Sequence, residues 1–210
     1  GTYGGDIYKY GHELSRPNQL LNGEYGAWRS IDLHTEPAAF DAKGIWSEER
    51  MCLLMETKIR QAESVKDSVC GQFQWIYSSH DNPGRRQPDE ALRRIDKVGP
   101  FNYKGLVTPW EEPLDVYYMY KSNYRLPEEE PMVYLVSHTW NNRFEKSGRR
   151  RATIEAYSNC DSVLLYNDAT NDVYLGRKVN HGRGTHFTWE NRDIRYNVLR
   201  AVGYYDGKPV

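Results

Sequence analysis

A short acidic segment bounded by prolines, Leu126-Pro-Glu-Glu-Glu-Pro131, separates two parts of the sequence with different hydrophobic patterns. Before it, strand-like apolar runs alternate with stretches of helical spacing. After it, short apolar runs are divided by turn residues, and no helical period occurs. A change of this kind indicates separate domains. We therefore predict an α/β domain at residues 1–126 and an all-β domain at residues 127–210.

The first domain follows a strand, helix, strand, loop, helix order, which is typical of a parallel sheet. We expect strands at Gln19–Asn22 and Gln72–Tyr77. A helix should begin after Ser47 as its N-cap, and a second helix should begin at Pro113. The apolar residues of the first helix recur at three- and four-residue spacing: Met51, Met55, Ile59, Ala62, Val65 and Val69.

The second domain shows the pattern of an antiparallel β-sandwich of immunoglobulin type. Strands are expected at Met132–Trp140, Ala152–Ser158, Val163–Tyr166, His186–Trp189 and Val198–Tyr205. The run Arg149–Arg151 is expected at a solvated hairpin tip rather than in a nucleic-acid patch. Asp206-Gly207 predicts a tight hairpin turn close to the last residue of the chain, so we expect this domain to be truncated there.

The composition excludes several functional classes. The formal net charge of -1 argues against broad nucleic-acid binding, which depends on an excess of Lys and Arg. No stretch is apolar for long enough to span a membrane as a helix. The 17 Tyr and 6 Trp, against 5 Phe, suit stacking on carbohydrate, although strands are also rich in Tyr.

The cysteines give no sign of a metal site or cofactor. Cys52, Cys70 and Cys160 form neither a CxxC motif nor a metal-binding spacing with His. We expect Cys52 and Cys70 to be small buried apolar groups. No metal and no cofactor is expected.

The segment Arg16–Trp28 carries the strongest candidate for catalysis. A short apolar run leads to Glu24, which is flanked by glycines and followed by aromatic residues. A buried parallel strand that presents one acid at its carboxyl end has this pattern, and active sites of (β/α)₈ barrels are assembled from such strand ends. Glu24 is therefore our candidate catalytic residue.

Three motifs in the first domain resemble the end of the catalytic barrel of glycoside hydrolase family 2: Arg16-Pro17, Asn22-Gly-Glu24-Tyr25-Gly26 and Gly71-Gln-Phe73-Gln-Trp75. In the second domain, Ala156–Asn167 together with Leu175-Gly176-Arg-Lys178 is similar to the immunoglobulin-like domain that follows the barrel in many bacterial members. The resemblance covers nearly the whole chain in the expected order.

This resemblance implies that residues 1–126 form the C-terminal part of a (β/α)₈ TIM barrel. Glu24 then matches the nucleophile at the end of barrel strand 7, and Trp75 matches the strand-8 tryptophan that lines the sugar subsite. Tyr3 matches the tyrosine that touches the nucleophile.

Further substrate contacts are expected on the loops that follow these strands. His34 lies after Glu24, and His80 and Asp81 lie after Trp75; loop polarity explains these residues equally well. Trp28 is expected to be a subsite wall or a support.

The resemblance also implies a retaining mechanism that requires two carboxylates. In this family the general acid/base is the Glu of an Asn-Glu pair, and no such dipeptide occurs in the chain. Glu111 and Glu112 are explained as acids at a helix start and are assigned no catalytic role. We therefore expect the chain to be an inactive part of a longer protein whose missing N-terminal part supplies the acid/base. If the protein resembles many family members, it is periplasmic or secreted.

Three functions remain open from the sequence. The leading prediction is an exo-acting, β-galactosidase-like retaining glycosidase that acts on terminal β-linked sugars of oligo- or polysaccharides. A β-glucuronidase of the same family is the alternative, and Arg29, Arg85 or Arg86 could then face the sugar carboxylate. From another class, the chain could be a non-catalytic carbohydrate-binding or structural module.

Overall fold

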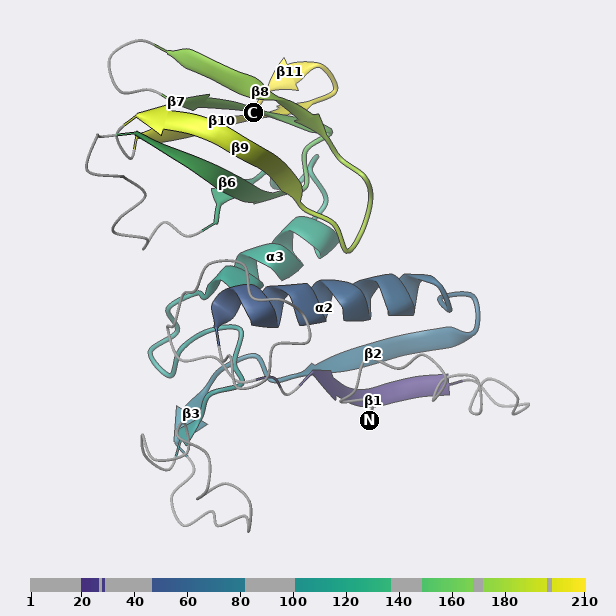
Figure 1. Ribbon diagram of the computed structural model, residues 1–210. Coiled ribbons are helices and arrows are strands. Elements are labelled where there is room, and N and C mark those ends of the chain that lie inside the picture. Colours follow the sequence, from purple (N-terminus) through teal and green to yellow (C-terminus); the bar gives the residue numbers. More distant parts are fainter. Residues whose placement is uncertain are drawn as a thin grey trace. The chain divides into compact units, whose positions relative to one another are not determined.

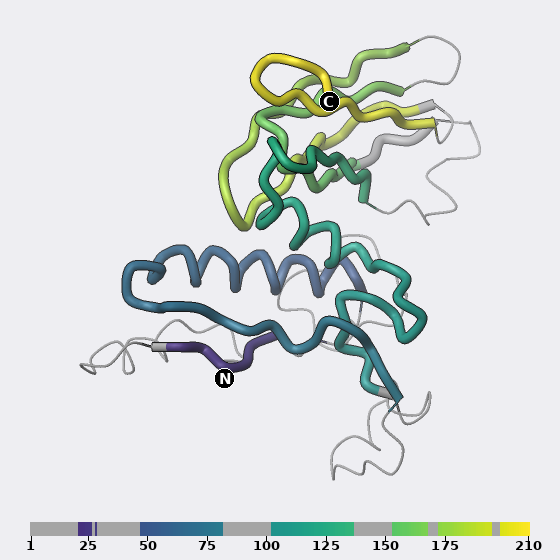
Figure 2. Tube along the Cα trace, turned by 180° about the vertical axis from the view of Figure 1, so that it is seen from behind, coloured from purple at the N-terminus to yellow at the C-terminus, as the bar shows by residue number. Residues whose placement is uncertain are grey.

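The computed structural model describes residues 20–26, 28, 47–81, 101–136, 149–167, 172–195 and 198–210. The chain divides into two compact units, Gly1–Tyr117 and Tyr118–Val210, which we describe separately (Figure 1, Figure 2). The division falls within a helix, a few residues before the domain boundary proposed from the sequence.

The described part of the first unit contains a parallel strand pair, two helices and a small antiparallel pair. In chain order these are β1 (Leu20–Gly26), α2 (Glu48–Glu63), β2 (Val69–Trp75), β3 (His80–Asp81), β4 (Phe101–Asn102) and α3 (Asp115–Tyr124), the last of which extends into the second unit. β1 and β2 are parallel neighbours, and β3 and β4 are antiparallel neighbours. The strand–helix–strand order β1-α2-β2 agrees with the sequence prediction.

Helix α2 begins as its sequence predicts. The Ser47 hydroxyl accepts a hydrogen bond from Arg50 N at 3.3 Å and caps the helix. Met51, Met55 and Ile59 are buried, so this part of the predicted apolar stripe is the packed face of the helix. The helix ends at Glu63, so the predicted helical placement of Val65 and Val69 is wrong, and Val69 begins β2.

Helix α3 begins later than predicted, so the placement of Pro113 at its first position is wrong. Pro113 instead forms an antiparallel bridge with Val107, and the helix starts at Asp115. Asp115 N donates to the carboxylate of Glu48 at 2.7 Å, so a buried acid from α2 satisfies this helix terminus. Glu111 and Glu112 lie in the turn before the helix and not in its first turn.

The second unit consists of two antiparallel sheets. One sheet has the order β5-β6-β9, and the other has the order β11-β10-β7-β8. Their strands are β5 (Val133–Leu135), β6 (Arg149–Ser158), β7 (Ser162–Asn167), β8 (Val173–Val179), β9 (Phe187–Arg195), β10 (Leu199–Tyr205) and β11 (Lys208–Pro209). The expected all-β second half is thereby confirmed.

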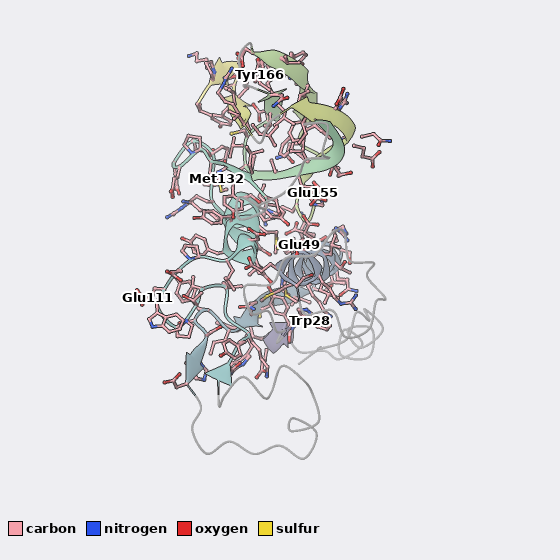
Figure 3. All side chains as sticks on the ribbon, turned by 60° about the vertical axis from the view of Figure 1, so that its left-hand side comes forward. Trp28, Glu49, Glu111, Met132, Glu155 and Tyr166 are labelled. Atoms are coloured by element: carbon pink, nitrogen blue, oxygen red, sulfur yellow. The ribbon has the colours of Figure 1, made fainter. Side chains whose placement is uncertain are left out.

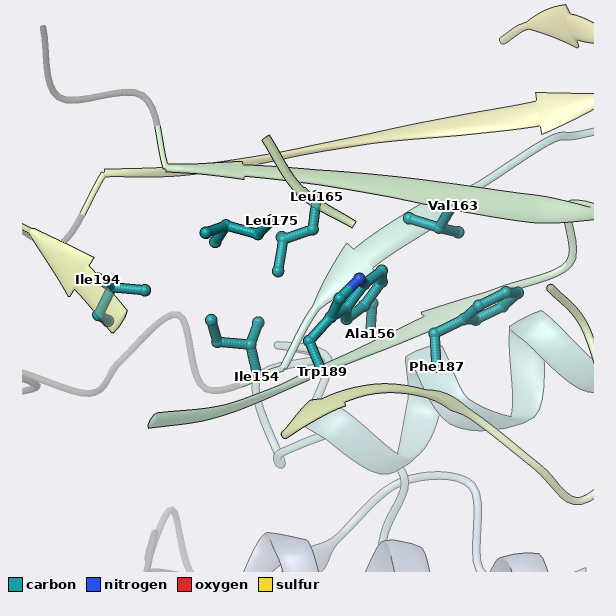
Figure 4. Packing of buried hydrophobic residues seen from close by; sticks show 8 residues of the cluster. All are labelled: Ile154, Ala156, Val163, Leu165, Leu175, Phe187, Trp189 and Ile194. Carbon is teal, nitrogen blue, oxygen red and sulfur yellow. The ribbon is translucent and has the colours of Figure 1, made fainter. Parts of the chain in front are cut away.

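Side chains from both sheets form one hydrophobic core (Figure 4). Trp189 is fully buried at its centre, and its indole Nε1 donates to the carbonyl of Gly176 at 3.0 Å. This hydrogen bond removes the cost of burying the indole N–H. The other members of the core are Ile154, Ala156, Val163, Leu165, Leu175, Phe187 and Ile194.

Two local features of this unit differ from the prediction. Arg149–Arg151 is not a hairpin tip, because it lies in β6 and pairs with Asp193–Arg195 of β9. β8 was not predicted, because a register irregularity beside Gly176, whose φ is 126°, interrupts its alternation. The predicted hairpin turn is confirmed: Asp206 and Gly207 have φ values of 49° and 73° between β10 and β11.

The cysteines follow the prediction only in part. Cys52 is buried in α2, as expected. Cys70 is exposed, so its predicted burial is wrong; it occupies the irregular position of β2 that β1 skips between Leu20 and Leu21. Cys160 is buried, and this burial raises the pKa of its thiol.

The Asn159 side chain attaches the backbone of the acidic segment to the sandwich. The amide nitrogen of Asn159 donates to the carbonyls of Arg125 and Glu130, at 3.1 and 2.9 Å. Its amide oxygen accepts from Met132 N at 2.9 Å. Asn159 is only 8% exposed, so this side chain satisfies backbone groups on both sides of Leu126–Pro131.

A substitution at Gly203 of β10 can test the packing between the two sheets. A Cβ at this position would lie 2.6 Å from Cys160 Sγ and 2.7 Å from Val133 Cγ2. We expect Gly203→Ala to destabilise the sandwich by about 1–3 kcal/mol through overpacking. Calorimetric unfolding of the chain measures this, and adding Cys160→Ala should restore part of the loss. An unchanged melting temperature for Gly203→Ala would contradict the packing described.

Candidate functional site

Glu24 lies in a bulge near the carboxyl end of β1. Asn22 pairs with Gln72, and the next pairing joins Tyr25 to Gln74, so β1 has one residue more than β2 in this interval. Bulges of this kind redirect a side chain and are frequent beside active sites. The Glu24 side chain is half-buried, between the buried residues Asn22 and Tyr25.

Trp75 ends β2 directly opposite the end of β1. Its pairing partner is Gly26, and its side chain is 38% exposed. Gly26 has a φ of 95°, and a Cβ there would lie 3.3 Å from the Trp75 carbonyl oxygen. The positive φ therefore favours glycine at this position. The Trp75–Ile76 peptide bond is cis. The structure thus brings the predicted nucleophile and the predicted platform to the same end of one parallel pair.

Trp28 lies against the beginning of α2 (Figure 3). The guanidinium carbon of Arg50 is 5.0 Å from the centroid of the indole ring, which is a cation–π distance. The Trp28 side chain is half-buried. This geometry favours a supporting role over direct exposure to a substrate.

His80 and Asp81 form the short strand β3 after β2. His80 pairs with Asn102 of β4, and its Nδ1 lies 3.4 Å from the Ser78 carbonyl oxygen. Asp81 is exposed. Burial and the nearby Asp81 charge raise the pKa of Tyr103. These residues form a polar group beyond Trp75.

Other predicted residues lie outside the described part of the chain. These are the site residues Tyr3 and His34, and the basic candidates Arg29, Arg85 and Arg86.

A backbone ladder holds residues 104–107 against the segment that follows Trp75. Gly105 is central to it, because a Cβ there would lie 2.2 Å from Ser79 N and 2.4 Å from the Val107 oxygen. Only glycine fits this approach. The bonds are Ile76 N to Lys104 O, Leu106 N to Ile76 O and Tyr77 O, Val107 N to Tyr77 O, Ser79 N to Val107 O, and Gly105 N to Ser79 Oγ.

The pairing of Asn102 with His80 and this ladder bring Asn102 and Lys104, which sequence reasoning missed, beside the segment that follows β2. Asn102 is only 4% exposed, and its Oδ1 and Nδ2 atoms have no hydrogen-bond partner among the residues that the structure describes. A buried amide in this state suits a ligand. Lys104 is half-buried two residues further on. The only sequence signal was an amide and a cation just before Gly105.

Metal and membrane features are absent from the described ranges. No group of His, Cys, Asp and Glu side chains there could hold a metal ion. Within the same ranges, no helix is long and apolar enough to cross a membrane.

Comparison with known proteins relates this chain to β-glucuronidases. Residues 150–210 match a domain of unknown function, DUF4982. A putative β-glucuronidase of Formosa agariphila is 32% identical over 139 residues, which are 66% of this chain and 15% of that protein.

The structure has the fold of the corresponding part of solved β-glucuronidases. The Parabacteroides merdae β-glucuronidase with glycerol in its active site matches 100% of this chain with a TM-score of 0.74 and 23% identity. Bacteroides uniformis β-glucuronidase 2, covalently bound to cyclophellitol-6-carboxylate aziridine, also matches 100% of the chain, with a TM-score of 0.72 and 23% identity. The chain spans 27% and 24% of these two structures.

Gly105→Ala should disrupt the ladder severely, because the new methyl group would collide with backbone atoms that cannot rotate away. We expect a loss of about 3 kcal/mol or more in unfolding free energy. Ser79→Ala removes only the 3.0 Å hydrogen bond from Gly105 N and should cost about 1 kcal/mol. Denaturant unfolding compares the two variants, and equal losses would contradict a steric role for Gly105.

Proposed function

We propose that this chain is part of a retaining exo-β-glycosidase of glycoside hydrolase family 2 that removes terminal β-linked glucuronate from oligo- or polysaccharides. The observation that carries the choice of sugar is the buried amide of Asn102, held with Lys104 at the strand end that presents Trp75. The similarity to proteins named β-glucuronidases supports the same class.

The domain assignment is part of this proposal. Residues 1–126 would be the C-terminal part of a (β/α)₈ barrel, with β1 and β2 as its seventh and eighth strands. Their parallel pairing across α2 supports this. Residues 127–210 would be an immunoglobulin-like sandwich, supported by the two antiparallel sheets and their shared core.

In the proposed reaction, Glu24 attacks the anomeric carbon of the terminal sugar and forms a glycosyl-enzyme. The glycosidic C–O bond breaks, and the rest of the saccharide leaves as an alcohol after its oxygen takes a proton from the general acid. Water then hydrolyses that ester with retention of configuration. The general acid/base is a second carboxylate outside this chain, which in retaining enzymes stands about 5–5.5 Å from the nucleophile. The covalent adduct of the Bacteroides uniformis relative is consistent with such a mechanism. Trp75 would supply an apolar face to the sugar ring.

Asn102 and Lys104 would distinguish a uronate from a neutral sugar. The carboxylate of glucuronate can accept a hydrogen bond from the Asn102 amide nitrogen and lies favourably near the Lys104 cation. A galactoside has a neutral hydroxymethyl group at this position and makes no use of that charge. We therefore prefer the glucuronidase to the β-galactosidase-like alternative.

The proposal also assigns substrate-binding roles to the other predicted site residues. His80 and Asp81 would contact sugar hydroxyls, and Trp28 would brace the subsite. The roles of Tyr3 and His34 are proposed from the sequence resemblance.

Glu24→Ala in the full-length protein should reduce kcat for 4-nitrophenyl β-glucuronide by about 10⁴- to 10⁶-fold, because the covalent step is lost. Glu190→Gln, which changes an exposed carboxylate in β9, should leave kcat unchanged. Initial rates across a panel of nitrophenyl glycosides measure this. Hydrolysis of the galactoside but not the glucuronide by the unmodified protein would refute the choice of sugar.

Asn102→Ala and Lys104→Met should each lower kcat/KM for the glucuronide by about 10- to 100-fold, the scale of one hydrogen bond to a charged group. The weaker activity on a neutral glycoside should change much less. The ratio of the two kcat/KM values is therefore the measurement. Equal losses on both substrates would indicate a structural role for these residues and not recognition of the carboxylate.

A further inference from the structure

Trp110 is a large apolar side chain presented to solvent, with 77% of its surface exposed. It lies between Pro109 and the two acids Glu111 and Glu112 in the turn before α3. Isolated exposed hydrophobic residues are common and require no explanation by themselves. Trp110 differs from such residues in the hydrogen bonds that fix its backbone and in its connection to the candidate site.

The turn around Trp110 is fixed by hydrogen bonds to a single residue, Thr108. Its hydroxyl oxygen accepts from Trp110 N at 3.3 Å and from Glu112 N at 3.1 Å. Its backbone donates to the Glu112 carbonyl at 2.9 Å and accepts from Glu111 N at 3.0 Å. Glu111 adopts a φ of 66°, a conformation that is costly for a residue other than glycine. The backbone that carries the indole is therefore held in one conformation, which lowers the conformational entropy lost when the side chain binds a ligand.

This turn is joined directly to the ladder at the candidate site. Val107 pairs with Ser78 on one side and with Pro113 on the other, so it links the segment after Trp75 to both ends of the turn. The same ladder carries Lys104. Glu111, labelled in Figure 3, lies at the outer edge of this unit. Trp110 thus belongs to the segment between β4 and α3, which the ladder joins to the residues that follow Trp75.

We propose that Trp110 is a stacking platform for the saccharide that is linked to the terminal uronic acid, and that this saccharide is neutral. The inference rests on the proposed function. It names the part of the substrate that the enzyme recognises on the leaving-group side of the cleaved bond. A flat, exposed indole suits the apolar C–H face of a sugar ring.

The two acids that follow Trp110 favour a neutral saccharide at this position. Glu111 and Glu112 are both exposed, so their carboxylates can accept hydrogen bonds from sugar hydroxyls. The same charges repel a sulfated or uronate residue at this position. The acidic end of the substrate is thereby directed toward Lys104, and the neutral part toward Trp110.

The test compares short and long substrates on the full-length protein. The substrates are 4-nitrophenyl β-glucuronide and a tetrasaccharide with a terminal β-linked glucuronate followed by neutral sugars. Trp110→Ala should leave kcat/KM for the nitrophenyl substrate unchanged and lower kcat/KM for the tetrasaccharide about tenfold, mainly through KM. Trp110→Phe should retain part of the effect. Tyr174→Ala, which removes an aromatic ring of 56% exposure from the sandwich, is the matched control and should behave like the unmodified protein.

A binding measurement separates this inference from the proposed function. Calorimetric titration of the Glu24→Gln protein with the glucuronate-terminated tetrasaccharide should give an affinity about tenfold higher than the same titration of Glu24→Gln/Trp110→Ala. The same tetrasaccharide sulfated on the sugar next to the glucuronate should bind more weakly than the unsulfated one. Equal affinities with and without Trp110 would overturn the platform. Failure of the unmodified protein to hydrolyse the nitrophenyl glucuronide would instead refute the proposed function.

Discussion

The candidate site depends on the backbone ladder between residues 76–79 and 104–107. This ladder is possible only because Gly105 has no Cβ, since any other side chain would occupy the space of the Ser79 nitrogen and the Val107 oxygen. It fixes a loop of irregular structure as firmly as a strand, with hydrogen bonds running in both directions. Lys104 and Trp110 owe their positions relative to β2 to this contact, and the pairing of Asn102 with His80 extends it.

The bulge in β1 has a complementary effect on the other side of the site. An extra residue between Asn22 and Tyr25 breaks the alternation of the strand at Glu24. In a regular strand Glu24 would lie on the same face as the buried Asn22. The inserted residue removes this constraint, and the regular pairing resumes at Tyr25 and Gly26.

The sequence predicts those parts of the fold that depend on local chemistry. The Ser47 cap, the first turns of the apolar stripe of α2 and the Asp206-Gly207 turn each depend on a few neighbouring residues, and each is confirmed. Asn102 could not be found in this way, because its importance arises from pairing with a segment more than twenty residues away. The start of α3 was misplaced because Pro113 also suits the bridge with Val107.

The composition of the acidic segment 126–131 does not indicate how firmly its backbone is held. Its prolines and glutamates are typical of a linker between domains, yet Asn159 holds the backbone at Arg125, Glu130 and Met132. A protease must draw several residues of extended backbone into its cleft, and this backbone is already engaged. The segment is therefore structurally part of the sandwich. Proteolytic cleavage there requires the end of β6 to unfold first.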